Sequence, residues 1–420
     1  MNHSALDVRS LYEPELDGLR LVAFMCVFLH HLPPRMPIPV TYGWIGVELF
    51  FVLSSYLFFR LLDCEFARTK TIRIRDFFVR RALRIYPLMV CFTLGMAFYF
   101  ATWNSQAQLR LLSIATFTDN IVTWFYGYNE AIPETVHLWT LAFEFQVYLF
   151  IPGAFLAWKR LGTHSFLVTV GVLYVVMLSA RLIVTSTGVP HPVVWVTPFL
   201  QPEAVLLGIV LATGVLDRVP AWIWPAVFIT AGWQFIHTPV PWAGVLPAAL
   251  SYPLAGITCL ALVQAARRLA PVQAVFRFPA LAFLGTISYG LYVFHLFGIH
   301  QAGTWLIALM GPLNVQKSIP DYVAYGAAGL LLTILMAAAS YYILEMPFLR
   351  LKRRFEVVHG REGSPEVVAQ TGLVSDAKIG PPTTTSANLK TLEEDSSSNP
   401  HDFCRSSISE QDPPGTSLRT

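Results

Sequence analysis

Long apolar runs alternate with short polar loops along most of this chain, and the pattern predicts helices that cross a lipid bilayer. Each run is long enough to span about 30 Å of hydrocarbon as an α-helix. The sequence therefore predicts an all-α, polytopic membrane bundle of about ten transmembrane helices. The expected spans cover residues 17–34, 43–62, 82–103, 137–158, 165–186, 198–215, 219–237, 243–265, 281–301 and 321–345.

Composition supports this class. Of the 420 residues, 55% are hydrophobic and 13% are charged, with a mean hydropathy of +0.53, which excludes a soluble globular domain. The five cysteines are scattered and form no CxxC pair, so neither a disulfide scaffold nor a thiolate metal site is expected. We expect no metal, no permanently bound cofactor and no nucleic-acid partner; the lipid bilayer is the expected environment, and the oligomeric state stays open.

Arginine and lysine residues are concentrated in every second loop. Residues 60–84, between the second and third spans, contain eight of them, and further basic groups follow the fourth, sixth, eighth and tenth spans. The opposite loops carry little basic charge beyond Arg35, Arg110 and Lys317. The positive-inside rule therefore predicts a multi-pass protein of the plasma or inner membrane with both termini in the cytoplasm.

Three regions lie outside the predicted spans and differ from them in composition: an N-terminal leader, the segment 104–136 and a C-terminal tail. Residues 1–16 form a polar leader that we expect to be cytoplasmic, and residues 17–350 form the transmembrane domain. Residues 351–420 shift to Ser, Thr, Pro, Asp, Glu and Gly, which predicts a disordered cytoplasmic tail. The segment 104–136 is amphipathic and aromatic, and we interpret it as an interfacial or re-entrant outer segment, because a further span there would reverse the charge pattern.

The first span contains two costly side chains, Arg20 and His31. Eleven residues of helix bring them to one face, about 16 Å apart along the axis. His31, His137 and His295 all fall in the outer halves of their spans, so the topology predicts that they converge at one membrane level. Glu144 follows His137 by about two turns and lies on the same helical face, which favours a histidine base held in one tautomer by a neighbour. The alternative is that these groups only satisfy one another inside the bundle.

Six segments, in order from residue 16 to about 350, resemble the integral-membrane acyltransferase 3 family. That family transfers acyl groups, often acetyl, from acyl-CoA to hydroxyls of lipopolysaccharide, exopolysaccharide, peptidoglycan and other glycosides. The segments are Leu16-Asp-Gly-Leu-Arg20 with His31, Gly46-Val-Glu-Leu-Phe-Phe-Val-Leu-Ser-Ser-Tyr56, Phe77-Phe-Val-Arg-Arg-Ala-Leu-Arg-Ile-Tyr-Pro87, His137-Leu-Trp-Thr-Leu-Ala-Phe-Glu144, Gly285-Thr-Ile-Ser-Tyr-Gly-Leu-Tyr-Val-Phe-His295 and Glu345-Met-Pro-Phe348.

Three positions depart from the family pattern. Ser55 stands where the family commonly has glycine, and Thr140 replaces a serine but keeps the hydroxyl. Gln201, in the weaker match Gln201-Pro-Glu203, stands where the family more often has arginine. The first departure affects close helix packing, and the last leaves the contribution of the sixth span open.

The resemblance implies roles for these residues. Acyl-CoA, with acetyl-CoA expected, is the co-substrate, and a carbohydrate or glycoside is the acceptor. Arg80, Arg81 and Arg84 are candidates to hold the CoA phosphates, although topology signalling alone would also explain them. Residues expected to face or support the substrates are Glu48, Ser54, Trp139, Ser288, Tyr289, Tyr292, His295 and Glu345, for which packing and interhelical hydrogen bonding are the alternatives.

We predict that His31 is the general base, that Glu144 or His137 orients it, and that Arg20 positions the donor or stabilises developing negative charge. A second route passes the acyl group through the protein, on His31 or on a hydroxyl such as Ser54 or Ser288. The competing functional class is a transporter or exporter without acyl transfer, since polar residues in spans also mark substrate pathways. A membrane sensor with a regulatory tail is a weaker alternative.

Overall fold

The structure is a computed structural model that describes residues 13–33, 41–128, 130–316 and 318–356. These residues form helices and connecting loops and contain no β-strand. The α-helices are α1 (Pro14–His30), α2 (Ile45–Thr69), α3 (Ile74–Tyr99), α4 (Ser105–Ala115), α5 (Asp119–Tyr126), α6 (Trp139–Ser186), α7 (Glu203–Ala212), α8 (Ile223–His237), α9 (Val245–Arg268), α10 (Ala270–Phe276), α11 (Pro279–Thr286), α12 (Ser288–Met310), α13 (Ile319–Ser340) and α14 (Met346–Lys352).

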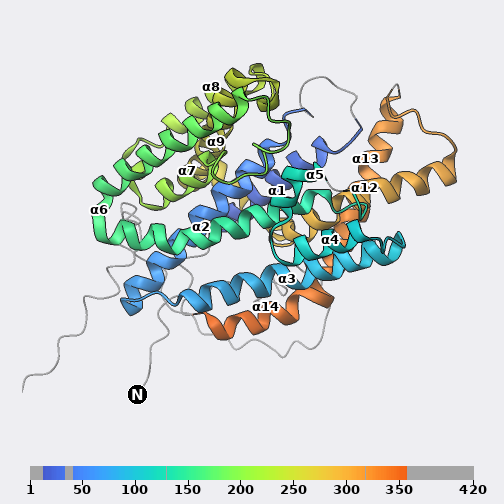
Figure 1. The fold of residues 1–420 in the computed structure, drawn as a ribbon, viewed down its shortest axis with the longest axis horizontal. Helices are drawn as coiled ribbons and strands as arrows, with labels where there is room; N and C mark the ends of the chain where they lie inside the picture. Colours follow the sequence, from blue (N-terminus) through green and yellow to red (C-terminus); the bar gives the residue numbers. More distant parts are fainter. Residues whose placement is uncertain (1–12, 34–40, 129, 317, 357–420) are drawn as a thin grey trace, which may run out of the picture.

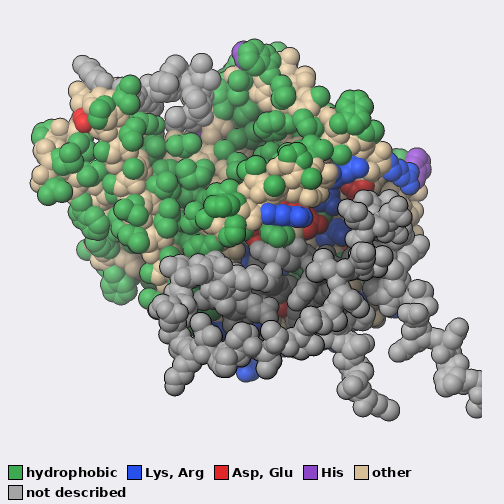
Figure 2. Space-filling view, turned by 180° about the vertical axis from the view of Figure 1, so that it is seen from behind, with side chains coloured by type: hydrophobic (Ala, Val, Ile, Leu, Met, Phe, Trp, Pro, Cys, Tyr) green, Lys and Arg blue, Asp and Glu red, His purple; other side chains and the backbone are tan. Residues whose placement is uncertain are grey.

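The predicted all-α membrane bundle is confirmed, and every predicted span overlaps a helix. Among the described residues, six helical segments are long and apolar enough to cross a bilayer, while α1, α7 and α8, with 17, 10 and 15 residues, are shorter. In Figure 2, hydrophobic side chains cover most of the visible face, and charged side chains gather beside the residues drawn in grey. An apolar outer surface of this kind suits contact with lipid tails. The six segments are Ile45–Thr69, Ile74–Tyr99, Val136–Ser186, Val245–Arg268, Ser288–Met310 and Ile319–Phe355.

The fourth and fifth predicted spans share helix α6, which folds back at a bend (Figure 1). The sequence suggested a loop here, but the bend is made by Gly162, whose φ of 76° lies in the left-handed region that glycine adopts without a Cβ clash. Beside the bend, Lys159 pairs with Asp63 of α2 at 2.6 Å. The basic end of the fourth span is therefore tied to the neighbouring helix.

Helices α2 and α7 approach closely because Gly208 of α7 faces Ser55 of α2. A Cβ at Gly208 would lie 2.2 Å from the Ser55 Oγ atom, which is too close for any side chain. Ser55 itself donates to the Phe51 carbonyl at 2.6 Å, so its hydroxyl is satisfied within α2. The serine that replaces the family's glycine is thus accommodated by a glycine on the opposite helix.

Segment 104–136 folds into the short helices α4 and α5, and neither is long enough to cross a membrane. Arg110 is fully buried and pairs with Asp119 at 2.6 Å, and it also donates to the Thr135 carbonyl at 2.6 Å. Burial raises the pKa of the Asp119 carboxyl and lowers that of Arg110, while their mutual attraction opposes both shifts. Arg110, which the charge pattern counted among the few cations of the outer loops, is thus buried and holds segment 104–136 together.

Near the end of the described chain, a π-helical turn (Tyr341–Glu345) leads into α14, which packs beside α3 (Figure 1). The Phe355 carbonyl accepts from Arg80 of α3 at 2.7 Å. The packed region therefore continues a few residues past 350. The predicted tail beyond residue 356 and most of the leader, residues 1–12, lie outside the described residues.

Candidate active site

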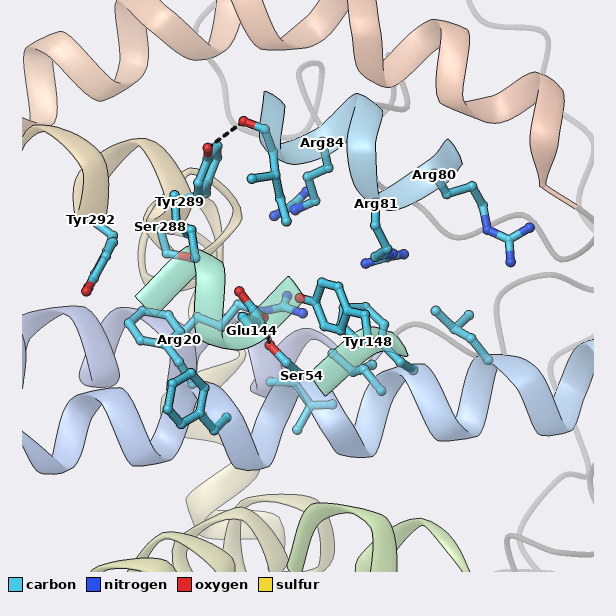
Figure 3. Close-up of a pocket in the computed structure, with 18 of the residues that line it drawn as sticks. Arg20, Ser54, Arg80, Arg81, Arg84, Glu144, Tyr148, Ser288, Tyr289 and Tyr292 are labelled. Atoms are coloured by element: carbon cyan, nitrogen blue, oxygen red, sulfur yellow. Dashed lines mark hydrogen bonds between the residues drawn. The ribbon is translucent and has the colours of Figure 1, made fainter. Parts of the chain in front are cut away.

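A cavity between α1, α2, α3, α6 and α12 gathers the arginines that the sequence singled out (Figure 3). We call it the arginine cavity. The lining contains equal numbers of cations and carboxylates, so ion pairs determine much of its electrostatics. Its lining includes Arg20, Arg80, Arg81, Arg84, Lys352, Glu13, Asp17, Glu65, Glu144, Glu356, Ser54, Tyr148, Ser288 and Tyr289.

The four arginines of this cavity differ in their surroundings. Arg20 pairs with Asp17 one turn earlier on α1. Arg80 is buried and pairs with Glu65 at 3.1 Å, in addition to its bond to the Phe355 carbonyl. The Arg81 guanidinium lies 4.0 Å from the centre of the Phe58 ring, whereas Arg84 is half-buried. Arg80 is therefore part of the internal framework, and Arg81 and Arg84 line the cavity beside it.

Ser54 and Glu144 form the polar centre of the arginine cavity. The Ser54 hydroxyl donates to Glu144 Oε1 at 2.6 Å, which joins α2 to α6 (Figure 3). Ser288 begins α12 and lines the same cavity, and the Tyr289 hydroxyl next to it donates to the Ile85 carbonyl at 2.7 Å. A serine hydroxyl bonded to a carboxylate is an arrangement that suits proton removal from the serine.

A second cavity, which we call the histidine cavity, is lined by His31, His137 and Trp139 of the predicted residues. His31 and Trp139 line it together with rings from five further segments. The lining includes His30, His31, His137, His191, Trp44, Trp139, Trp195, Trp242, Tyr128 and Glu130.

His31, His137 and His295 meet at this cavity. The rings of His31 and His295 lie 4.8 Å apart, and those of His137 and His295 also lie 4.8 Å apart. The sequence-based expectation that three histidines from distant segments converge is confirmed. His295 itself is fully buried behind the other two.

The hydrogen bonds of these histidines define their tautomers. His31 Nδ1 lies 2.9 Å from the Val27 carbonyl oxygen, which only accepts, so Nδ1 carries the proton. The same Nδ1–H points to His295 Nε2 at 3.3 Å, and His295 Nδ1 donates to the Tyr292 carbonyl at 2.6 Å. Neutral His31 therefore keeps its lone pair on Nε2, the atom that a general base uses.

Glu144 does not belong to this histidine cluster, contrary to the sequence-based expectation. It lies in the arginine cavity, bonded to Ser54. Seven helical residues separate it from His137 by about 10 Å along the axis, so a shared helical face does not place the two groups in one cavity. The groups that orient His31 are the Val27 carbonyl and His295 instead.

Three residues, Val47, Thr140 and Tyr292, line both cavities and form the wall between them. The hydroxyls of Thr140 and Tyr292 lie 2.8 Å apart, and the His137 carbonyl accepts from them at 3.0 and 3.2 Å. The wall is therefore a hydrogen-bonded contact between α6 and α12. It separates the two cavities by a single layer of side chains.

Four helices pass from one cavity to the other: α1 and α12 run from the arginine cavity toward the histidines, and α2 and α6 run in the opposite direction. This order agrees with the alternating topology of the predicted spans. The residues run from Arg20 to His31 on α1, from Trp44 through Val47 to Ser54 on α2, from His137 through Thr140 to Glu144 at the start of α6, and from Ser288 through Tyr292 to His295 on α12.

Two predicted carboxylates lie outside both linings. Glu48 is buried in α2, close enough to Arg181 and Glu203 to interact with their charges. Glu345 is buried in the π-helical turn, where it accepts from Ser340 at 3.4 Å. Both side chains are therefore buried between helices of the bundle and face neither cavity.

Sequence reasoning missed Arg181, which is fully buried in the second half of α6. It binds Glu203 through two nitrogens at 2.6 and 2.9 Å and donates to the Leu200 carbonyl at 3.0 Å. Gln201 stands where the family more often has arginine, and it lies between Leu200 and Glu203, the two residues that Arg181 bonds. Arg181 therefore brings a guanidinium to this place from another helix. The signal in the sequence was a lone arginine inside an apolar span. Among the residues that the structure describes, no group of three potential ligands is placed to hold a metal ion.

The chain is similar to known acyltransferases. A family model described as an acyltransferase domain, that of the acyltransferase 3 family, matches residues 13–338. The chain is 26% identical over 363 residues to provisionally named O-acetyltransferases of Staphylococcus aureus, with 80% of this chain and 57% of the relative covered. It is 25% identical over 378 residues to the peptidoglycan O-acetyltransferase OatA of Listeria monocytogenes, with 80% of this chain and 56% of the relative covered.

The S. aureus O-acetyltransferase OatA is 26% identical over 367 residues, again with 80% of this chain and 57% of the relative covered. The chain thus spans a little more than half the length of the curated relatives that it matches. No solved structure matches it significantly. Because the family model matches well over half of the sequence, across both cavities and the wall between them, the chain belongs to the acyltransferase 3 family.

Proposed function

We propose that this protein is a membrane O-acyltransferase that moves an acetyl group from acetyl-CoA to a hydroxyl of a carbohydrate acceptor. The observation that carries the proposal is the pairing of two cavities. One contains arginines, the other contains a histidine with an available lone pair, and a single layer of side chains separates them. Membership of the family and the names of the relatives support acetyl transfer.

The donor occupies the arginine cavity in this proposal. Arg81 and Arg84 contact the CoA phosphates from α3, while Arg20 lies deeper and faces the thioester. The strongly basic stretch 60–84 contributes Arg80, Arg81 and Arg84 to this cavity, and we propose that this end of the bundle faces the cytoplasm, where acyl-CoA is made. Charge attraction then raises the rate at which the anionic donor arrives.

The acceptor hydroxyl occupies the histidine cavity and is deprotonated by His31 Nε2. As the acceptor oxygen attacks the thioester carbonyl, its proton moves to His31, the carbon–oxygen bond forms and the carbon–sulfur bond breaks. The proton then passes to the departing CoA thiolate. His295 and the Val27 carbonyl hold the imidazole in the required tautomer throughout.

Two routes connect the cavities. In the direct route the thioester passes the wall of Val47, Thr140 and Tyr292 and meets the hydroxyl at His31. In the relay, the Ser54 oxygen attacks the thioester while Glu144 takes its proton, the carbon–sulfur bond breaks and that proton leaves with CoA as the thiol, an assignment supported by the 2.6 Å hydrogen bond between Ser54 and Glu144. The acceptor hydroxyl then takes the acyl group from Ser54, and its proton returns to the serine oxygen. Incubation with labelled acetyl-CoA in the absence of acceptor distinguishes the routes: the relay gives a protein-bound label that Ser54→Ala removes, and the direct route gives none.

The test of the proposed function is acceptor-dependent thiol release. Proteoliposomes that contain the full chain are supplied with acetyl-CoA, and free CoA is measured with and without a panel of glycans. We expect release of CoA in equal amounts to ester formed on the glycan. Transport of acetyl-CoA or glycan without any thiol release would refute the proposal and favour the transporter alternative.

A further inference from the structure

The mouth of the histidine cavity carries three aromatic side chains from three separate segments. Tyr128 follows α5, His191 lies in the connection between α6 and α7, and Trp242 lies in the short 3-10 helix Pro241–Ala243. The Tyr128 hydroxyl and His191 Nε2 are 3.1 Å apart, and the rings of His191 and Trp242 are 4.6 Å apart. We call these three residues the aromatic ledge.

The ledge is exposed although its side chains are large. Trp242 is 43% exposed and Tyr128 is 38% exposed, and both line the cavity. Tryptophan and tyrosine also gather at membrane interfaces, where they point outward toward lipid headgroups. The ledge differs because its rings contact one another across three segments and border a concave space that ends at His31.

Deeper in the cavity, three further tryptophans form a rigid wall. Trp44, Trp139 and Trp195 are 3, 4 and 6% exposed, and their rings contact one another with centroids 5.2 and 5.5 Å apart. These ring contacts fix the shape of the inner cavity, whose lining is mainly aromatic.

Charge distinguishes this cavity from its neighbour. Among the described residues, no arginine or lysine lines the histidine cavity, and Glu130 is its carboxylate. A phosphorylated or carboxylated ligand would be repelled by Glu130. Neutral hydroxyl groups, in contrast, can donate hydrogen bonds to Glu130.

We propose that the aromatic ledge binds a neutral pyranose ring of the acceptor and that this contact selects neutral over anionic sugars. The proposal rests on the function proposed above. The C–H face of a pyranose carries small positive charges and packs on the negative face of an aromatic ring, while its hydroxyls stay at the ring edge. A sugar on the ledge directs the next hydroxyl along the chain into the cavity, toward His31.

Direct binding tests this proposal without any turnover. Equilibrium binding of radiolabelled chitotetraose, a neutral tetrasaccharide, is measured on the full chain in nanodiscs. We expect saturable binding that weakens about three- to tenfold in Trp242→Ala and recovers in Trp242→Phe. The matched control is Trp222→Ala, because Trp222 is 73% exposed at the start of α8 and lines neither cavity. No saturable binding by the unchanged protein would overturn the proposal.

Kinetics give the second readout and separate the two proposals. Trp242→Ala should raise the KM for chitotetraose by the same factor and leave kcat and the KM for acetyl-CoA unchanged. Tetragalacturonate, an anionic tetrasaccharide, should be a poorer ligand than chitotetraose. Equal binding of both sugars, or an unchanged KM in Trp242→Ala, would overturn the ledge while leaving the transferase proposal intact. Saturable binding of chitotetraose without any thiol release would overturn the transferase proposal and leave the sugar-binding ledge intact.

Discussion

The two cavities of this bundle lie on the same four helices but have opposite chemistry. The arginine cavity contains five cations and five carboxylates, many of them paired. The histidine cavity is lined by tryptophans and histidines, with Glu130 as its charged group among the described residues. The difference teaches that one helical bundle can keep a cavity rich in ion pairs apart from an aromatic one, because two turns of helix are enough to move from one environment to the other.

The largest expected effect comes from removing the base on the histidine side. His31→Ala should lower kcat by about 10²- to 10⁴-fold, because proton removal from the hydroxyl loses its acceptor, while the KM for acetyl-CoA stays unchanged. The measurement is thiol release in proteoliposomes. His237→Ala is the matched control, since His237 also bonds the carbonyl four residues earlier, at 2.7 Å, but is exposed and lines neither cavity. Full activity of His31→Ala would show that the histidine cavity is not where the proton is removed.

On the arginine side, the expected effect is on donor binding. Arg84→Gln should raise the KM for acetyl-CoA about tenfold through loss of a charge-assisted contact, and it should leave the KM for the acceptor unchanged. If Arg84→Gln changed only the KM for the acceptor, the assignment of the donor to the arginine cavity and of the acceptor to the histidine cavity would be wrong.

Arg80→Gln should act mainly on stability. It leaves the buried carboxylate of Glu65 without its 3.1 Å partner, so we expect a loss of about 3–5 kcal/mol and a lower melting temperature in nanodiscs. Arg80→Lys keeps the charge and provides the comparison. An unchanged melting temperature in Arg80→Gln would return Arg80 to the set of donor-binding candidates.

The smallest expected effect concerns the wall between the cavities. Tyr292→Phe removes the hydroxyl that bonds Thr140 at 2.8 Å, a contact worth about 1 kcal/mol, so the wall should open more often. We expect CoA release in the absence of acceptor to rise about fivefold as water reaches the thioester. The control is Tyr342→Phe, an exposed tyrosine on the π-helical turn. A lower rate with no acceptor-independent release would mean that the hydroxyl serves the transfer and does not close the wall.

Much of the architecture followed from the sequence. Apolar runs predicted the helices, since a chain in hydrocarbon must satisfy its backbone internally. The alternating topology also predicted that His31, His137 and His295 converge, because residues at one depth of a bundle are close in space. Arg110 shows the limit of this reasoning: the charge pattern assigned it to a loop but gave no information about its burial or about its partner Asp119.

Pair contacts within the site did not follow from the sequence. Periodicity placed His137 and Glu144 on one face, but it gives no information about what packs between them, and the Thr140–Tyr292 contact of α6 and α12 divides that face. Arg181 and Glu203 are paired only because the bend at Gly162 returns α6 toward α7. No motif near Gln201 therefore predicts that Arg181, from the second half of α6, lies there.

The sequence by itself determined the class of the protein, the helices, their alternating directions and the residues that approach one depth. Hydrophobic length and charge position are local properties of the chain, so they are readable in one dimension. Only the tertiary structure decided which polar residues share a cavity, that His295 and the Val27 carbonyl orient His31, and that a thin wall separates arginines from histidines. These depend on how side chains of different helices fill the space between them, and that packing is a property of the whole bundle.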